Sequence, residues 1–124
     1  MEILELINSG SKELKNSNIN SYKLDSEILL SKILNKTREE ILINLNDQVT
    51  TRTIQSYKKL IARRSFKEPI AYILKKKEFW SKNFFVDQST LIPRPETELM
   101  VEKLVNIFKE KKLHILDIGT GTGC

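Results

Sequence analysis

The stretch LHILDIGTGTGC (residues 113–124) combines a short, nearly all-apolar run with three glycines at alternate positions. The run at residues 113–118 predicts a strand covered on both faces, as in a parallel sheet. A strand that leads into glycines is typical of a cofactor site, because glycine allows tight turns and close approach of the backbone to a ligand. Ligands of open α/β sheets bind at the carboxyl ends of strands, so we expect a binding loop at residues 119–123.

The spacing of the glycines separates the classes of cofactor. A dinucleotide fingerprint that starts at Gly119 requires glycine or alanine where this chain has Cys124, and no lysine follows as in a P-loop. Asp117 instead stands two residues before Gly119, at the expected end of the strand. This pattern resembles the first motif of S-adenosylmethionine-dependent methyltransferases, whose cofactor has no pyrophosphate group. A plain glycine-rich turn is the alternative interpretation.

Upstream of this stretch, STLIPRPETELMVEKLVNIFKEKK (residues 89–112) contains the pattern of an amphipathic helix. Pro93 and Pro95 predict an extended entry, with Pro95 as the first helical residue. The predicted buried face of this helix comprises Met100, Val101, Leu104, Ile107 and Phe108. The preceding KEFWSKNFFVD (residues 77–87) predicts a β-hairpin, because aromatic and β-branched residues flank a short turn at residues 81–83.

The first 76 residues predict a compact bundle of four helices, followed by a short helix that starts at Pro69. The first helix contains Gly10, and glycine lowers helix propensity. Thr37 and Glu40 have the spacing of a capping box at the start of the third helix. The residues expected to face the core comprise Ile3, Leu4, Ile7, Leu14, Leu24, Ile28, Leu29, Ile33, Ile41, Leu42, Leu45, Ile54, Tyr57, Leu60 and Ile61.

The composition restricts the class of protein. The net charge of +5 permits an acidic partner such as RNA, but the basic residues are mostly lysines spread along the chain, so we expect no specific nucleic-acid site. One cysteine and one histidine cannot form a disulfide or a metal cluster within the chain. No apolar run approaches the roughly 18 residues of a membrane span. Glu2 and Glu5 argue against a signal peptide. We expect the protein to be cytoplasmic and monomeric.

Residues 68–102, together with residues 115–124, resemble the bacterial peptide chain release factor N5-glutamine methyltransferases, the HemK/PrmC family. The resemblance is specific from about Arg64 onward, whereas only a helical domain of the expected size supports it before that point. We interpret Glu68-Pro69 and Phe79-Trp80 as packing elements, because buried aromatic residues usually belong to the core. The matching motifs, in the family's order and spacing, are Glu68-Pro69, Ala71-Tyr72, Phe79-Trp80, IPRPETE (residues 92–98) and DIGTGTG (residues 117–123).

The resemblance implies a mainly α chain in three parts. These are a helical N-terminal bundle that docks the substrate (residues 1–76), a β-hairpin linker (77–93) and the incomplete start of a Rossmann-like α/β methyltransferase domain (94–124). It also implies methyl transfer from S-adenosylmethionine to the glutamine amide in the Gly-Gly-Gln loop of class I release factors. Arg94 and the following helix N-terminus suit the carboxylate of that cofactor, and a linker salt bridge is the equal alternative for Arg94. The candidate cofactor-binding residues are Arg94, Thr97, Gly119, Thr120, Gly121, Thr122 and Gly123.

Two departures from the family's pattern concern a turn and the catalytic machinery. The family usually has glycine where Lys75 stands, so we expect a reshaped turn into the hairpin. Residues 1–124 also lack the family's Asn-Pro-Pro-Tyr motif, which holds the target amide, and the later acidic residue that binds the ribose hydroxyls. An amide nitrogen is a poor nucleophile that must be oriented at the methyl carbon. We therefore expect no catalytic residue in this chain, which alone should be inactive and bind the cofactor weakly or not at all.

Three hypotheses about function follow. The first is the amino-terminal portion of a release factor glutamine methyltransferase, shortened by a gene truncation, a frameshift or an incomplete sequence. The second is a non-catalytic module that docks a release factor through its helices. The third is a fragment of a nucleic-acid adenine methyltransferase, which shares the glycine motif. The helical N-terminal part and the stretch PRPETE (residues 93–98) disfavour the third hypothesis.

Overall fold

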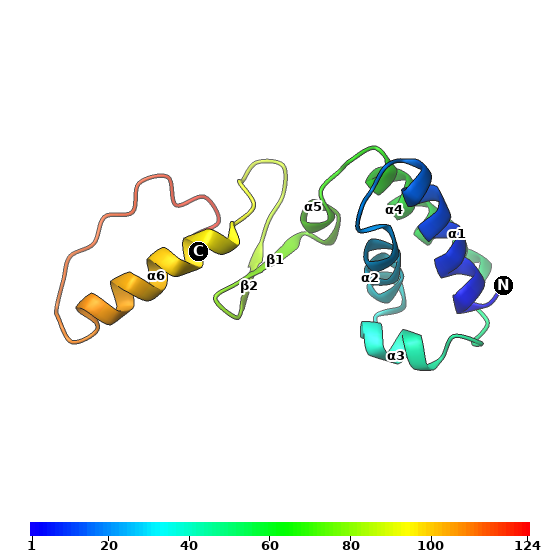
Figure 1. The fold of residues 1–124 in the computed structure, drawn as a ribbon, viewed down its shortest axis with the longest axis horizontal. Coiled ribbons are helices and arrows are strands. Elements are labelled where there is room, and N and C mark those ends of the chain that lie inside the picture. Colours follow the sequence, from blue (N-terminus) through cyan, green and yellow to red (C-terminus); the bar gives the residue numbers. More distant parts are fainter. The chain divides into compact units, whose positions relative to one another are not determined.

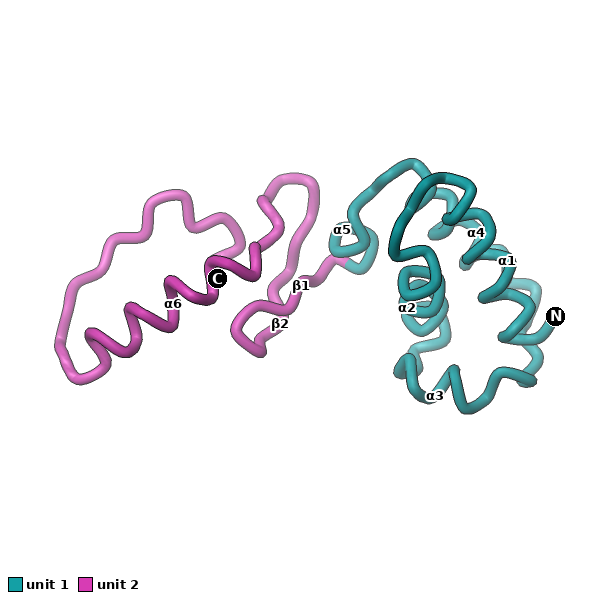
Figure 2. Tube along the Cα trace, viewed as in Figure 1, with its two compact units in different colours: residues 1–74 teal, residues 75–124 magenta.

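A computed structural model describes residues 1–124, and the chain divides into two compact units (Figures 1 and 2). We call residues 1–74 the helical unit and residues 75–124 the C-terminal unit. The predicted order of a helical bundle, a hairpin and a further helix is confirmed. No helix is both long and apolar enough to cross a membrane. The elements are α1 (Ile3–Asn16), α2 (Tyr22–Leu34), α3 (Arg38–Ile43), α4 (Thr51–Ser65), α5 (Ile70–Leu74), β1 (Lys76–Phe79), β2 (Lys82–Phe85) and α6 (Pro95–Phe108).

The core of the helical unit lies between α1, α2 and α4, with α3 and α5 packed at its edges. Burial of one large apolar side chain stabilises such a core by about 1.5–3 kcal/mol. The predicted capping box of α3 is confirmed, because the Glu40 backbone N–H donates to Thr37 Oγ1 over 3.2 Å and the Thr37 N–H donates to Glu40 Oε2 over 2.6 Å. The fully buried apolar side chains are Ile3, Leu6, Leu14, Leu29, Leu30, Ile41, Tyr57 and Ile61.

The prediction of the buried face was wrong for part of α2 and for two single positions. Leu24 is 43% exposed, and Leu4 and Leu42 are exposed as well. The physical reason for Leu24 is that two polar side chains of α2, Asp25 and Ser26, have hydrogen-bonding partners inside the bundle and therefore occupy its buried face. The buried residues of α2 are Asp25, Ser26, Leu29 and Leu30.

A hydrogen-bonded contact between Ser26 and Tyr57 explains the glycine in the middle of α1. Ser26 Oγ donates to the Ile7 carbonyl oxygen over 2.8 Å and lies 2.6 Å from the Tyr57 hydroxyl oxygen. Either hydroxyl can be the donor in this contact, because Tyr57 can also donate its single proton to the Ser26 carbonyl oxygen over 3.3 Å. A Cβ atom at Gly10 would lie 2.1 Å from that hydroxyl oxygen and 2.8 Å from the adjacent ring carbon. Gly10 is therefore required by the close approach of the tyrosine ring.

Burial of the Tyr57 hydroxyl predicts a loss of stability in alkali. Desolvation raises the pKa of Tyr57 from 10.0 to about 12, so the folded state retains a proton that the unfolded state has lost. This contribution to stability is complete below pH 10 and is lost as the pH rises towards 12. We expect the free energy of unfolding to fall by about 1.4 kcal/mol per pH unit in this window. Urea unfolding across the window measures the slope, and Tyr57→Phe should reduce it; an equal slope in the variant would contradict the assignment.

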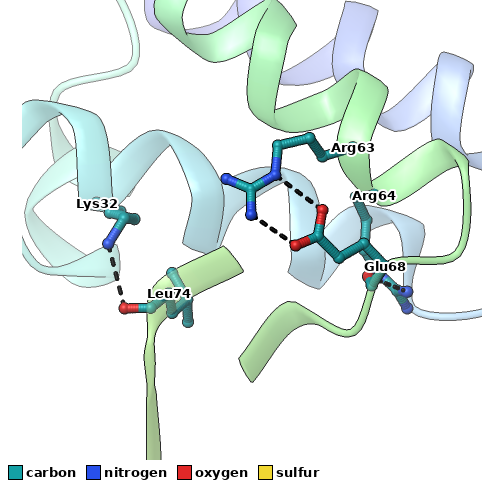
Figure 3. A network of polar contacts seen from close by, with 5 residues as sticks. All are labelled: Lys32, Arg63, Arg64, Glu68 and Leu74. Carbon is teal, nitrogen blue, oxygen red and sulfur yellow. Dashed lines mark hydrogen bonds and ion pairs between the residues drawn. The ribbon is translucent and has the colours of Figure 1, made fainter. Parts of the chain in front are cut away.

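Ionic contacts fix the junction between α4 and α5 (Figure 3). Arg63 donates two hydrogen bonds to the Glu68 carboxylate, and this bonding lowers the pKa of Glu68. Arg64 donates to Asp25 Oδ2 over 2.7 Å and to the Glu68 carbonyl oxygen over 3.0 Å. Lys32 Nζ donates to the Leu74 carbonyl oxygen at the end of α5, over 3.2 Å. Glu68 therefore fixes the turn before α5 through its charge and its backbone.

The β-hairpin forms as predicted, but its turn lies one residue earlier than expected. Strands β1 and β2 pair antiparallel, with Lys76 opposite Phe85 and Phe79 opposite Lys82. The turn residues are Trp80 and Ser81, whose φ values of 51° and 55° are typical of the type I′ turns that match the twist of a two-residue hairpin. Phe79 is buried, as the packing interpretation predicted, whereas Trp80 is exposed. The prediction failed because Trp80 lacks the usual turn chemistry of asparagine or glycine.

Lys75 connects α5 to β1 in the left-handed conformation, with a φ of 58°. This conformation destabilises a residue with a Cβ atom by about 1–2 kcal/mol through steric strain. Glycine avoids the strain but increases the conformational entropy of the unfolded chain. We expect Lys75→Gly to leave stability unchanged or to raise it by up to about 1 kcal/mol. The matched control is Lys76→Gly in strand β1, which should lower stability by about 0.5–1 kcal/mol. Hydrogen exchange of the hairpin amides measures both effects. An equal loss of stability in Lys75→Gly and Lys76→Gly would contradict the strain at Lys75.

The predicted start of α6 is confirmed, but two predictions downstream of it were wrong. Pro95 is the first residue of α6, whereas no residue of this helix is buried. Residues 113–118 form no strand, and Ile115, Leu116 and Ile118 are 81%, 82% and 86% exposed. A strand requires a neighbour for its backbone hydrogen bonds, and the sheet of the C-terminal unit contains only β1 and β2. Nothing in this unit covers the apolar face of α6 fully.

Candidate functional site

The C-terminal unit contains a cavity of about 490 Å³, a volume in the range of small-molecule sites. Its first wall is Phe79, at the end of β1. The second wall is residues 91–94 together with one face of α6, and the third is formed by residues of the segment 115–124. The apolar residues of α6 on this wall are Met100, Val101 and Leu104. The cavity therefore joins the start of α6 to the glycine loop.

All the predicted site residues except Gly123 line this cavity. Arg94 and Thr97 contribute from the start of α6, and residues 119–122 contribute from the glycine loop. The sequence interpretation did not assign Phe79 or Cys124 to the site, although both line the cavity. Asp117, recognised from its spacing to the glycines, lines it too. No local pattern identifies Phe79 as a lining residue, because its place depends on the hairpin register.

The backbone of the loop explains the alternate glycines. Gly119, Gly121 and Gly123 have φ values of 75°, 62° and 82°, a region that residues with a Cβ atom rarely adopt. A Cβ atom at any of these positions would meet nothing within 4 Å, so conformation and not packing requires glycine. The open space around each glycine allows a ligand to approach the backbone closely.

Two polar groups at the cavity are available to a ligand. The Thr122 hydroxyl oxygen is buried and has no hydrogen-bond partner within the chain, so it can bond to a ligand atom. Arg94 is exposed at the N-cap of α6 and belongs to none of the ion pairs formed by Arg38, Arg63 and Arg64. The positive end of the helix dipole and a guanidinium group both attract an anion. This arrangement suits a small molecule that carries a carboxylate.

Comparison with known families identifies the helical unit. The sequence model of the family described as "PrmC N-terminal domain" matches residues 5–74. The chain belongs to the PrmC N-terminal domain family. The PrmC match ends at Leu74, the residue at which the helical unit also ends. The core between α1, α2 and α4 is therefore the core of a PrmC N-terminal domain, and the cavity follows it in the chain.

Curated relatives extend the similarity beyond the PrmC N-terminal domain. The chain is 45% identical over 123 residues to the release factor glutamine methyltransferase of Buchnera aphidicola subsp. Acyrthosiphon pisum. This alignment covers 99% of the chain and 44% of the relative. The chain is 40% identical to the enzyme of the same name from Leptospira interrogans, over 98% of this chain and 43% of the relative. A bifunctional methyltransferase of Rickettsia typhi is 36% identical, over 98% of this chain and 27% of the relative. The chain thus spans less than half the length of these relatives.

Proposed function

We propose that the chain supplies the docking domain, the hairpin linker and one cofactor wall of a protein-(glutamine-N5) methyltransferase. One observation carries this proposal: a PrmC N-terminal domain precedes, in the same chain, a cavity that gathers Arg94, Thr97 and the glycine loop. In this proposal residues 1–76 dock the substrate, residues 77–93 form the hairpin linker and residues 94–124 begin the methyltransferase domain. The names of the aligned relatives support the same reaction.

S-adenosylmethionine is the methyl donor that we propose for the cavity, and the residues present fit it. Arg94 and the N-terminus of α6 would hold the carboxylate of its methionine end. The open glycine backbone would accommodate its nucleoside, and the unpartnered hydroxyl of Thr122 would receive a hydrogen bond from it or donate one. Thr97 adds a second hydroxyl to the same wall. When bound, the cofactor would supply an electrophilic methyl group.

The proposed substrate is the glutamine of the Gly-Gly-Gln loop in class I release factors. Its amide nitrogen is a weak nucleophile, so hydrogen bonds must hold the amide in line with the methyl group. The sequence of residues 1–124 contains no Asn-Pro-Pro-Tyr motif to do so. We therefore assign docking of the release factor, and not catalysis, to the helical unit. We also propose that the protein is a monomer in the cytoplasm.

The cofactor proposal predicts weak binding by residues 1–124 alone. The cavity offers one wall of the proposed site, and the ordering of the glycine loop opposes binding. We expect a dissociation constant of about 1 mM or larger, which corresponds to a binding free energy no more favourable than about −4 kcal/mol. Isothermal titration with S-adenosylmethionine measures it, and micromolar affinity would show that this wall alone is a sufficient site.

A second candidate function is a docking module without catalysis. The observation in its favour is that the helical unit has a closed core, whereas α6 has no buried residue. A pull-down with a purified class I release factor tests the docking that both candidates require. We expect the full chain to retain the release factor at physiological salt, while an unrelated protein of net charge near +5 does not. Failure to recover the release factor would refute the docking role of residues 1–76.

A further inference from the structure

Glu98, on the first turn of α6, holds the tip of the β-hairpin. Its Oε1 atom accepts a hydrogen bond from the backbone N–H of Trp80 over 2.7 Å. Bonds to a charged acceptor are about twice as strong as neutral ones. Trp80 and Ser81 both have positive φ values, and a bulky side chain is an outlier in that region. The carboxylate of Glu98 therefore supports a turn that its own residues disfavour.

The same hydrogen bond joins two walls of the 490 Å³ cavity. Phe79 precedes Trp80 and is only 2% exposed, and its side chain lines the cavity. Thr97 precedes Glu98 and lines the cavity from α6. Glu98 itself does not line this cavity but a separate hollow, which it shares with Glu78, Trp80 and Ser81. A change at Glu98 should therefore reach the cavity through the hairpin tip and not through direct contact.

We propose that Glu98 is a positioning residue, which fixes the hairpin wall of the cavity by anchoring Trp80 to the first turn of α6. This proposal rests on the proposed cofactor site for its functional meaning. It assigns Glu98 no contact with cofactor or substrate. Its effect on a bound ligand runs through the placement of Phe79, which lines the cavity together with Thr97.

Hydrogen exchange of the Trp80 amide in the full chain tests the anchor. We expect Glu98→Ala to speed exchange at Trp80 by about tenfold or more, the ratio typical of a lost charge-assisted bond. Glu98→Gln retains an acceptor oxygen in the same place and should recover most of the protection. The matched control is Glu102→Ala, which removes an exposed carboxylate one turn further along α6. Unchanged exchange in Glu98→Ala would overturn the proposal.

The methyl resonances of Thr97 and Val101, which both line the cavity, test whether the anchor reaches that wall. Displacement of the Phe79 ring in Glu98→Ala should shift these resonances, with recovery in Glu98→Gln and no shift in Glu102→Ala. Circular dichroism of each variant checks that α6 remains folded. Faster exchange at Trp80 without any shift at Thr97 or Val101 would reduce Glu98 to a support of the hairpin and overturn its positioning role.

A titration with S-adenosylmethionine separates this inference from the proposed function. If the cofactor perturbs the Thr97 and Val101 methyl groups of the wild-type chain, we expect Glu98→Ala to weaken its binding several-fold and Glu98→Gln to restore it. Unaltered affinity in Glu98→Ala would overturn the positioning role. If the wild-type chain shows no perturbation even at a cofactor concentration about tenfold above a dissociation constant of about 1 mM, while the methyl groups still respond to Glu98→Ala, the cofactor proposal for this wall fails and the effect of Glu98 on the cavity stands.

Discussion

Gly10→Ala should lower the free energy of unfolding of the helical unit by about 2–4 kcal/mol, the sum of overpacking and a disturbed buried hydrogen bond. The sign is the opposite of helix propensity, which favours alanine over glycine by about 1 kcal/mol within a helix. The reason is that the added Cβ would lie 2.1 Å from the Tyr57 hydroxyl oxygen, so the ring must move away from Ser26. Urea unfolding followed by far-ultraviolet circular dichroism measures the change.

Two variants control for this result. Ser9→Ala changes an exposed neighbour of Gly10 in α1 and should leave stability within about 0.5 kcal/mol of the wild type. Tyr57→Phe removes the atom that approaches the new Cβ most closely, so its combination with Gly10→Ala should recover at least about 1 kcal/mol relative to additivity. A Gly10→Ala protein more stable than the wild type would contradict the packing of Tyr57 against α1.

Arg64→Ala should lower the free energy of unfolding by about 3 kcal/mol, the low end of the usual cost of breaking a buried ion pair, because Ser21 Oγ still donates to Asp25 Oδ2 over 2.9 Å. Asp25 is 4% exposed and receives the Arg64 Nε hydrogen bond over 2.7 Å. The substitution also removes the bond from Arg64 to the Glu68 carbonyl oxygen, which helps to fix the turn before α5. Urea unfolding at neutral pH measures the loss.

The ion pair between Arg38 and Glu27 provides the matched control. Its arginine side chain is exposed, so solvent screens the pair, and Arg38→Ala should cost no more than about 1 kcal/mol. Comparison of Arg64→Ala with Arg38→Ala tests whether burial determines how much an ion pair stabilises this bundle. Equal losses in the two variants would show that Asp25 is solvated in solution.

The helices were predictable from the sequence because apolar spacing and caps are local signals. The capping box of Thr37 and Glu40 and the start of α6 at Pro95 needed nothing beyond neighbouring residues. The buried face of α2 was not predictable in this way. Asp25 and Ser26 are buried because Arg64 and Tyr57, on α4, supply their partners, and local periodicity contains no information about such distant contacts.

The candidate site shows the same division between local and distant signals. The spacing of the glycines predicted a tight binding loop, and in the structure all three glycines have positive φ. The strand expected at residues 113–118 is absent, because apolar character alone cannot supply a hydrogen-bonding neighbour. The turn at Trp80 and the anchor from Glu98 were also missed, since the sequence there lacks the usual turn residues.

Methyl transfer tests the central claim most directly. Residues 1–124 would be joined to the remaining C-terminal part of the Buchnera relative, which is 45% identical over this region, and incubated with labelled S-adenosylmethionine and a class I release factor. We predict methylation of the glutamine in the Gly-Gly-Gln peptide, located by mass spectrometry, and a marked loss of rate in the same chimaera with Arg94→Ala. An unmethylated glutamine, under conditions in which the intact Buchnera enzyme modifies it, would contradict the proposed role of this chain.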